Sequence, residues 1–365
     1  MSDSLVPDNE ISAPAAESST AAEAVPPAET IQNPELQGAG WQLRLGRLAG
    51  LGTGAVALAA LAGLASRGGW LFALAGIFRV QYFWGLLLGT VLLLATGRRT
   101  AAIFAALLLA FHGWLLWPFY ASTAVPRLSQ DATTGPVRLR VVTLNVWARN
   151  VQHERVVDFL RKTAADIVVL EEVYPAWVPH LKSLEPDWPH HTSLTREVRY
   201  GMAIFSRWPL DHDRNEFLSD GVPVIAARVL VQETPLAIFG VHLSRPLTRR
   251  GSARQTLQLA ELPDLLKDKS LEQIILGDFN ATPWSPRFFD FLSQAGLADS
   301  RLGFGVHASW PSGLPAALRI PIDHCLVSKN IRVVRHELGP SVGSDHLPVI
   351  VDLEIDGSVA KNESE

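Results

Sequence analysis

The sequence predicts an α/β domain that follows a group of about three transmembrane helices, and three features of the chain support this. The first forty residues hold seven acidic and no basic residues. Long runs without a charged residue come next, up to residue 121. From residue 137 onward, short runs rich in Val, Ile and Leu alternate with segments of helical apolar spacing, which is the pattern of an α/β domain.

The two ends of the chain are expected to be disordered. Residues 1–40 combine acids with Ala, Pro, Ser and Thr, so they cannot bury enough surface to offset the entropy lost on ordering. Residues 357–365 form a second such tail. The net charge of −4 is mild and argues against a broad electrostatic contact with nucleic acid. The one cysteine, Cys325, excludes an internal disulfide framework.

Residues 41–121 form the predicted membrane region. Its apolar runs cover 48–65, 82–97 and 101–121, and a helix needs roughly 20 apolar residues to cross the hydrocarbon core of a bilayer. The first and third runs are long enough, whereas the second is short unless the polar residues before it reach the interface. A buried helical hairpin in a soluble protein is the alternative, and three such runs in succession disfavour it.

Basic residues predict the orientation of these spans, since cytoplasmic loops of membrane proteins are enriched in Lys and Arg. The pairs on the predicted cytoplasmic side are Arg44 with Arg47 and Arg98 with Arg99. With three spans, the rest of this multi-pass cell-membrane protein then faces the periplasm or the exterior. Arg67 and Arg79 lie in the external connection and count against this orientation, unless residues 68–80 form an interfacial helix.

A linker, 122–136, leads to the predicted domain, 137–356. The central stretch of that domain is 274–280, an apolar strand that ends in Asp278 and Asn280. Because side chains alternate along an extended chain, Asp278 and Asn280 lie on the same side of the strand's exit. An ordinary strand followed by a turn is the alternative for this stretch taken alone.

Polar residues also stand at the ends of other predicted strands, where a core would not select them. They are Asn145, Glu172, His242, Asp345 and His346. With Asp278 and Asn280 they comprise acids, amides and histidines without cysteine, which is the ligand set of a hard divalent ion engaged in phosphate chemistry. The chain has no phosphate-binding P-loop, no serine nucleophile elbow and no H-E-x-x-H zinc motif.

Seven motifs occur in a fixed order along the domain: T-L-N-V-W, V-L-E-E-V, G-M-A-I-F-S-R-W-P, G-V-H-L, L-G-D-F-N, I-D-H and S-D-H-L-P-V. In this combination the chain, from about Arg138 to Glu354, resembles the endonuclease/exonuclease/phosphatase superfamily of DNase I-like proteins. The resemblance implies a four-layer α/β sandwich, in which two packed mixed sheets are flanked by helices. It also implies a hydrolase of phosphoester bonds that depends on Mg²⁺, with Mn²⁺ as the alternative ion.

The same resemblance implies a role for each matching residue. Glu172 looks like the principal metal ligand, with Asn145 and Asp345 close to the ion. The family usually has Gln where this chain has Glu171, and Glu172 aligns with the family's glutamate. Whether Glu171 shares in binding the ion is left open. The implied catalytic residues are Asp278, acting on the attacking water; Asn280, holding a phosphate oxygen; His346, oriented by Asp323; and His242, on the opposite phosphate oxygen.

The substrate is indicated by two further likenesses. Abasic-site nucleases carry an acid where this chain has Trp147, so T-L-N-V-W is more similar to the lipid-phosphodiesterase and DNase I-like branches. Three spans before such a domain resemble bacterial membrane phosphatases associated with glycopeptide-antibiotic resistance, thought to act on undecaprenyl pyrophosphate. Arg245, Arg249 and Arg250 are candidates for binding a diphosphate or anionic headgroups, or else form a solvated helix start.

The leading hypothesis is a membrane-anchored phosphoesterase that attacks a phosphate ester or a pyrophosphate, such as a lipid-linked one, with an activated water. A membrane-bound nuclease is the first alternative, and a non-catalytic membrane scaffold is the second. The expected partners are the lipid bilayer and a phosphorylated substrate. Nucleic acid is a less favoured substrate, and no protein partner is predicted.

Overall fold

The computed structural model describes residues 34–121, 136–196, 200–266 and 270–355. The predicted C-terminal tail, nearly all of the predicted linker and most of the predicted N-terminal tail lie outside these ranges. The tail boundary expected at residue 40 differs from the structure, because helix α1 (Pro34–Leu64) begins at Pro34. Proline is favoured in the first turn of a helix, where its missing N–H would have no partner.

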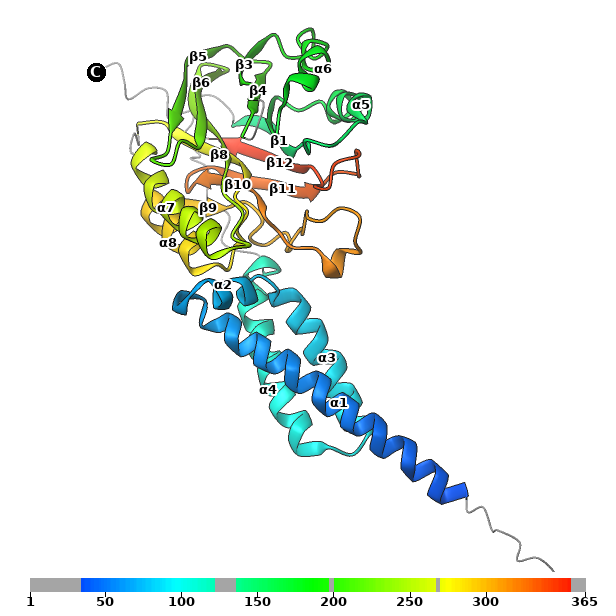
Figure 1. Cartoon of the computed structure of the whole chain (residues 1–365). Coiled ribbons are helices and arrows are strands. Elements are labelled where there is room, and N and C mark those ends of the chain that lie inside the picture. Colours follow the sequence, from blue (N-terminus) through cyan, green and yellow to red (C-terminus); the bar gives the residue numbers. More distant parts are fainter. Residues whose placement is uncertain (1–33, 122–135, 197–199, 267–269, 356–365) are drawn as a thin grey trace, which may run out of the picture.

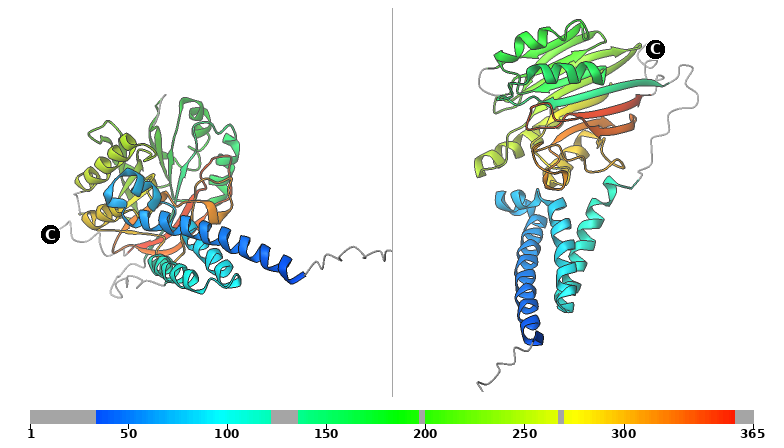
Figure 2. Two further views of the ribbon diagram at one scale, coloured as in Figure 1. Left: turned by 60° about the horizontal axis from the view of Figure 1, so that its bottom comes forward. Right: turned by 90° about the vertical axis from the view of Figure 1, so that its right-hand side faces the viewer.

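The N-terminal helices form an elongated bundle, which we call the anchor (residues 34–121). Helices α1, α3 and α4 run away from the rest of the molecule, and the short α2 lies across their near end (Figures 1 and 2). The elements after α1 are η1 (Ser66–Gly68), α2 (Trp70–Gly76), α3 (Arg79–Ala95), α4 (Arg99–Leu116) and η2 (Trp117–Phe119).

Two stretches of the described chain, Trp41–Leu64 and Arg99–Phe119, are long and apolar enough to cross a membrane. A third span requires α2 and α3 to count as one, and these two helices are bent by 65° at the break between them. Three spans therefore stay a prediction. The interfacial helix considered for residues 68–80 corresponds to α2, which ends before Arg79.

The domain contains two six-stranded sheets, with the strand orders β11-β12-β1-β2-β4-β3 and β5-β6-β7-β8-β10-β9. The strands of the first sheet are β1 (Val137–Asn145), β2 (Ile167–Glu171), β3 (His190–Leu194), β4 (Met202–Ser206), β11 (Arg332–Leu338) and β12 (Val349–Ile355). Those of the second are β5 (Leu210–Phe217), β6 (Pro223–Val231), β7 (Thr234–His242), β8 (Glu272–Asp278), β9 (Leu297–Asp299) and β10 (Asp323–Ser328).

Helices cover the outer face of each sheet, so that helix, sheet, sheet and helix form four layers (Figure 1). The first sheet carries α5 (His153–Thr163) and α6 (Val178–Lys182), and the second carries α7 (Arg249–Leu265) and α8 (Pro286–Ala295). Two short 3₁₀ turns, η3 (Pro175–Trp177) and η4 (Ala316–Leu318), complete the elements. The predicted arrangement of two mixed sheets flanked by helices is confirmed.

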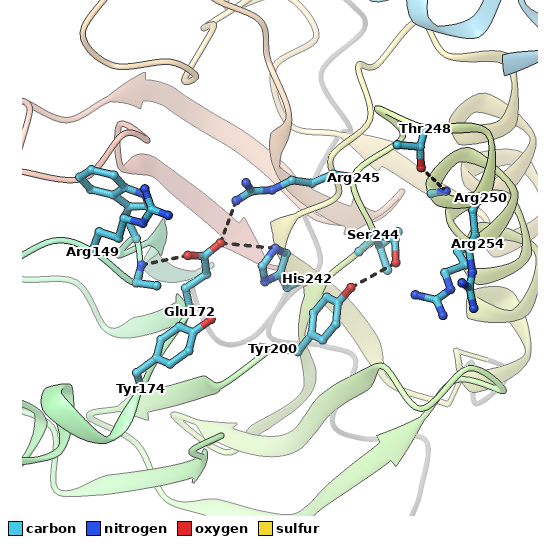
Figure 3. Close-up of a pocket in the computed structure, with 14 residues that line it drawn as sticks. Arg149, Glu172, Tyr174, Tyr200, His242, Ser244, Arg245, Thr248, Arg250 and Arg254 are labelled. Atoms are coloured by element: carbon cyan, nitrogen blue, oxygen red, sulfur yellow. Dashed lines mark hydrogen bonds and ion pairs between the residues drawn. The ribbon is translucent and has the colours of Figure 1, made fainter. Parts of the chain in front are cut away.

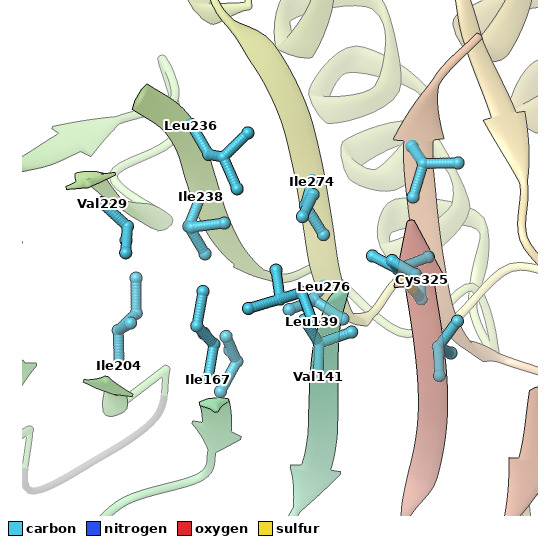
Figure 4. Packing of buried hydrophobic residues seen from close by; sticks show 14 of the residues in the cluster. Leu139, Val141, Ile167, Ile204, Val229, Leu236, Ile238, Ile274, Leu276 and Cys325 are labelled. Atoms are coloured by element: carbon cyan, nitrogen blue, oxygen red, sulfur yellow. The ribbon is translucent and has the colours of Figure 1, made fainter. Parts of the chain in front are cut away.

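Aliphatic side chains from both sheets fill the space between them. In β8, Ile274 and Leu276 point into this space, where Val141 and Ile167 of the first sheet meet them (Figure 4). The intervening Ile275 packs on the other face, in the cluster beneath α7 and α8. Alternation along β8 therefore explains why an uninterrupted apolar run is needed in a strand that is covered on both faces.

Strand direction decides where the polar strand ends gather. β1 is parallel to β2, and β7 is parallel to β8, so each pair presents its carboxyl ends at one edge of its sheet. β12 is antiparallel to β1, and β10 is antiparallel to β8, so both begin at that same edge. The chain segments that carry the predicted site residues therefore meet at one end of the sandwich.

Candidate active site

The ends of strands from both sheets bring the predicted site residues together. Asn145, His242 and Asp278 are the last residues of β1, β7 and β8. Asp323 is the first residue of β10 and stands opposite Asp278 in the ladder. Across the two sheets, the Asn145 amide nitrogen donates a hydrogen bond to Asp278 Oδ2 at 3.2 Å. Residues far apart in sequence thus form one buried polar group.

Glu172 directly follows β2 and points its carboxylate into a cleft (Figure 3). Its backbone turns out of the strand with a φ of 59°. Oε2 accepts a hydrogen bond from the Ala148 N–H at 2.9 Å, and Oε1 accepts one from the Arg245 guanidinium at 2.9 Å. Burial raises the pKa of Glu172, but the neighbouring His242, the Ala148 N–H and Arg245 together lower it. The carboxylate is therefore ionised at neutral pH.

Glu171, the last residue of β2, lies in the interior instead. Its side chain is fully buried, and Oε1 accepts a hydrogen bond from the Thr143 hydroxyl at 2.6 Å. Burial raises the pKa of Glu171 well above its ordinary value, so this carboxyl is neutral. A neutral carboxyl has nearly the shape of a glutamine amide and can also donate a hydrogen bond. Of the two adjacent acids, Glu172 is the one that lines the cleft.

Asp278 stands at the centre of the site and is fully buried. Oδ1 accepts a hydrogen bond from the Asn280 backbone N–H at 2.8 Å, and Oδ2 accepts one from the Asn280 side-chain amide at 3.1 Å. Oδ2 also lies 3.7 Å from Nε2 of His242 and 3.8 Å from Nε2 of His346. Burial and the negative charge of Asp323 raise the pKa of Asp278 to about 7, so the group can accept a proton near neutrality.

His346 and Asp323 form a buried pair. His346 Nδ1 lies 2.9 Å from Asp323 Oδ2, which also accepts a hydrogen bond from the Ser309 hydroxyl at 2.5 Å. Burial lowers the pKa of His346, but Asp323, Asp278 and Asp345 outweigh burial and raise it to about 10. The imidazole is therefore positively charged and directs Nε2 toward Asp278.

His242 differs from His346 in its charge. Burial lowers the pKa of His242 to about 4, so the ring is neutral at pH 7. Its Nε2 lies 4.0 Å from Glu172 Oε1, and its ring meets Tyr200 edge to face with centroids 5.2 Å apart. Within the described residues, His242 Nδ1 is buried without a hydrogen-bond partner. Burial thus leaves this nitrogen without a partner among those residues, while Nε2 points toward Glu172 and Asp278.

Asp345 lies beside His346. Its Oδ1 is 3.9 Å from His346 Nε2, and its Oδ2 accepts a hydrogen bond from the Trp310 indole N–H at 3.2 Å. Oδ1 is buried and has no hydrogen-bond partner in the part of the chain that the structure describes. No hydrogen bond joins Asp345 to Glu172 or Asn145 among those residues, so its predicted place beside the same ion stays a prediction.

The donor set at this site fits a divalent cation. The Glu172 carboxylate is ionised and holds a cationic group, the Arg245 guanidinium. Asp345 Oδ1 is an oxygen without a hydrogen-bond partner among the residues that the structure describes. A second group has ligand atoms within 4.8 Å of one another and consists of Asp278, Asp323 and His346. In that group the Asp323 carboxylate already binds His346 Nδ1 and the ring is charged, so its chemistry suits proton transfer better than metal ligation.

Arginines line the cleft, which has a volume of 530 Å³. Those that line it are Arg149, Arg245, Arg250 and Arg254, with Tyr174 and Tyr200 nearby (Figure 3). Of the three predicted arginines, Arg249 is exposed and does not line the cleft. It stands beside Arg250 in the first turn of α7, where neighbouring side chains point in different directions.

Sequence reasoning did not identify Ser309, Tyr200 or Arg149 as part of the site. Ser309 lies in a loop with no regular pattern around it, and its contact with Asp323 spans fourteen residues. Tyr200 donates to or accepts from the Ser244 hydroxyl at 3.2 Å and so packs on the loop after His242. Only the tertiary structure brings Tyr200 and Arg149 to the cleft and Ser309 to Asp323.

Comparison with known proteins gives a family and a fold. A sequence model of the Endonuclease/Exonuclease/phosphatase family matches residues 142–346, more than half of the chain. A humanized D. rerio TDP2 with 14 mutations is 18% identical, with a TM-score of 0.51, over 59% of this chain and 98% of that one. An endonuclease/exonuclease/phosphatase from Beutenbergia cavernae DSM 12333 is 20% identical, with a TM-score of 0.50. The match covers 60% of this chain and 72% of that one.

A third solved structure, D. rerio TDP2 complexed with a single strand DNA product, is 17% identical with a TM-score of 0.51, over 59% of this chain and 98% of that one. At these identities the solved structures establish the fold of the domain. No curated protein matches the sequence.

Proposed function

The chain belongs to the endonuclease/exonuclease/phosphatase family, and from this premise we propose that it is a membrane-anchored, divalent-metal-dependent phosphoesterase acting on a lipid-linked phosphate. Members of this family are typically hydrolases of phosphoester bonds. The observation that carries the proposal is the convergence of Glu172, Asp278 and His346 beneath an arginine-lined cleft, in a domain that is docked on apolar helices.

Asp278 is the base that activates the attacking water. Its pKa of about 7 lets it accept a proton near neutrality, and Asn280 holds both of its oxygens in place. The charged His346 lies 3.8 Å away and can donate the Nε2 proton to the phosphate or to the leaving oxygen. The proton of the water therefore goes to Asp278, while His346 meets the charge that develops on the substrate.

Glu172 holds the divalent cation in this proposal, with Asn145 and Asp345 as further ligands, and a bound cation supplies positive charge to the phosphate oxygens. His242 is neutral, so it can donate one N–H to a second phosphate oxygen without adding charge. Mg²⁺ is the proposed ion, because the donors are oxygens and no cysteine is among the residues that line the cleft.

The anchor supports a substrate that stays in the bilayer. Helix α7, which carries Arg250 and Arg254, shares a small cavity with α2 of the anchor. If α2 lies at the interface, these arginines stand near the level of lipid headgroups. Arginines bind phosphate through paired hydrogen bonds, so Arg250 and Arg254 suit a second phosphate group, as in a lipid pyrophosphate.

The direct test uses the full chain, purified in detergent, and measures phosphate released from undecaprenyl pyrophosphate with Mg²⁺ or Mn²⁺. Release is expected, with its loss in Asp278→Asn as the control for a contaminating phosphatase. Absence of release with either ion would remove the lipid-pyrophosphate substrate.

A nuclease is the second candidate, because one structural neighbour was solved with a single strand DNA product. Nicking of plasmid DNA by the same preparation, abolished by Asp278→Asn, would favour this candidate. The mild net charge of −4 and the docked anchor favour the lipid substrate.

A further inference from the structure

The catalytic domain is docked on the near end of the anchor through several direct contacts. The Arg67 guanidinium forms two hydrogen bonds of 2.7 Å with the Asp290 carboxylate of α8. The Trp284 indole N–H donates to the Gly76 carbonyl at 2.9 Å, and the Gln81 amide donates to the Arg319 carbonyl at 2.9 Å. Arg67, which counted against the predicted orientation, thus has a partner in the domain. A domain on a flexible tether would need none of these contacts.

An apolar cluster lies at the centre of this junction. Phe119 of η2 is 6% exposed and meets the Trp284 ring edge to face, with ring centroids 6.1 Å apart. Leu116 and Val306 complete the buried cluster. Trp284 follows Asn280 by four residues, and Val306 precedes Ser309 by three, so both domain residues of the cluster belong to segments that lead into the active site.

The loop of residues 300–312 continues from the anchor to the catalytic residues. Its Gly303 N–H donates to the Pro118 carbonyl at 3.1 Å, and its Gly305 N–H donates to the Phe119 carbonyl at 2.6 Å. Gly305 has a φ of 115°, which residues with a side chain rarely adopt. The loop therefore follows the end of η2 with its backbone, and glycine permits the required conformation.

Ser309, in the same loop, binds Asp323 and the residue that directly follows His346. Its hydroxyl donates to Asp323 Oδ2 at 2.5 Å, and its carbonyl accepts from the Leu347 N–H at 3.0 Å, directly after His346. In addition, the fully buried Arg301 of this loop donates to the Asp323 carbonyl. The loop is therefore fixed to the anchor at Gly303 and Gly305, and to Asp323 by residues on either side of these glycines.

We propose that Phe119 is a positioning residue, through which the anchor holds the 300–312 loop, and thereby Asp323 and His346, in their reactive arrangement. The anchor is then a part of the catalytic structure as well as a membrane attachment. The expected change in kcat rests on the proposed phosphoesterase function. The expected change in the position of the 300–312 loop rests on the docking contacts alone.

The kinetic test compares Phe119→Ala with Trp117→Ala in the full chain, with bis(p-nitrophenyl) phosphate and Mg²⁺ in detergent. Trp117 lies two residues away with a side chain that is 64% exposed, so its replacement alters the same turn without opening the cluster. Because the probe is soluble, membrane attachment cannot affect its concentration. Phe119→Ala is expected to lower kcat about 10- to 100-fold with little change in KM, since small displacements of catalytic groups have effects of this size.

Two further variants separate positioning from loss of folding. Phe119→Leu keeps an apolar side chain in the cluster and should recover most of kcat. Ser309→Ala keeps the junction but removes the hydroxyl on Asp323, and should lower kcat in the same direction. Equal kcat for Phe119→Ala, Trp117→Ala and the unaltered protein would overturn the proposal.

Hydrogen–deuterium exchange provides a readout that does not depend on activity. Phe119→Ala should increase exchange in peptides covering 303–309 and 344–348, while β6, which is paired on both sides with β5 and β7, serves as the internal reference. Unchanged exchange in both peptides would overturn the positioning role. If the unaltered protein hydrolyses neither the probe nor undecaprenyl pyrophosphate but exchange increases as expected, the phosphoesterase function fails and the docking inference stands.

Discussion

At the scale of single residues, two adjacent glutamates have opposite environments. Glu172 is ionised at the cleft beside Arg245, whereas Glu171 is neutral and bonded to Thr143 in the interior. The positive φ of Glu172 accounts for the difference, because the turn after β2 directs its side chain out of the alternating pattern of the strand. The same chemical change at the two positions should therefore have different effects.

Glu172→Gln should weaken Mg²⁺ binding by at least about tenfold, since removing even an indirect partner of a metal ligand has an effect of that size. Isothermal titration with Mg²⁺ measures this directly. Glu171→Gln is the matched control and should leave both Mg²⁺ affinity and activity nearly unchanged, because the neutral carboxyl is replaced by an amide of its own shape. The reverse ranking would assign the metal to Glu171.

Asp278→Asn should lower kcat about 100- to 10,000-fold, the usual contribution of a general base.

In the unaltered protein, protonation of Asp278 removes the base, so activity should rise with pH through the pKa of this group. That pKa is about 7 from burial and Asp323, and a bound cation would move it lower. A pH–rate profile at saturating Mg²⁺ should therefore show a rising limb at or below pH 7. A flat profile from pH 5 to 8 would exclude Asp278 as the base.

At the scale of elements, the end of β8 depends on one glycine. Gly277 has a φ of 142° and stands opposite Val241 of β7 in the parallel ladder. A Cβ atom at this position would lie 1.9 Å from the Val241 carbonyl oxygen, so any side chain must push the two strands apart. The close approach holds Asp278 and His242, the next residues of the two strands, side by side.

Gly277→Ala should lower the free energy of unfolding by at least about 1–3 kcal/mol, the usual range for a strained backbone conformation. It should also lower kcat, because the displacement occurs next to Asp278. Gly313→Ala is the control, since a Cβ there meets nothing within 4 Å. Thermal unfolding and the bis(p-nitrophenyl) phosphate assay measure the two effects. Full activity in Gly277→Ala would show that the strand ends tolerate displacement.

At the scale of the whole molecule, the catalytic domain and Arg98 lie at opposite ends of the anchor. Arg98, between α3 and α4, packs against α1: a Cβ at Gly46 would lie 2.8 Å from its Nε. The domain contacts the other end, through Arg67, Trp284 and Phe119 (Figures 1 and 2). If Arg98 and its neighbours face the cytoplasm, the domain faces the periplasm or the exterior.

Alkaline phosphatase fused after Ile355 should therefore be active in intact cells, because this enzyme requires export. The same enzyme inserted at Gly97, in the turn between α3 and α4, should be inactive. A green fluorescent protein fusion should give the opposite pattern at both positions. Fluorescence after Ile355 would place the domain in the cytoplasm, and a lipid pyrophosphate in the outer leaflet would then be out of reach.

The sequence by itself determined the central strands, the apolar anchor helices and the polar residues at the strand ends. These features are local: an apolar run such as 274–276 is required in any strand that is covered on both faces, and Asp278 and Asn280 are conspicuous at its end. The four edge strands of the two sheets are β3, β5, β9 and β11. Edge strands are covered less, so their composition carries a weaker pattern.

Tertiary structure alone decided that Glu171 lies in the interior, which arginines line the cleft and how the domain meets the anchor. Each of these depends on contacts between distant residues, such as Arg67 with Asp290, Asn145 with Asp278 and Gly305 with Phe119. Local patterns specify whether a residue is buried in its own element, because burial follows the period of that element. They do not specify its partner, because the partner is set by the packing of whole layers against one another.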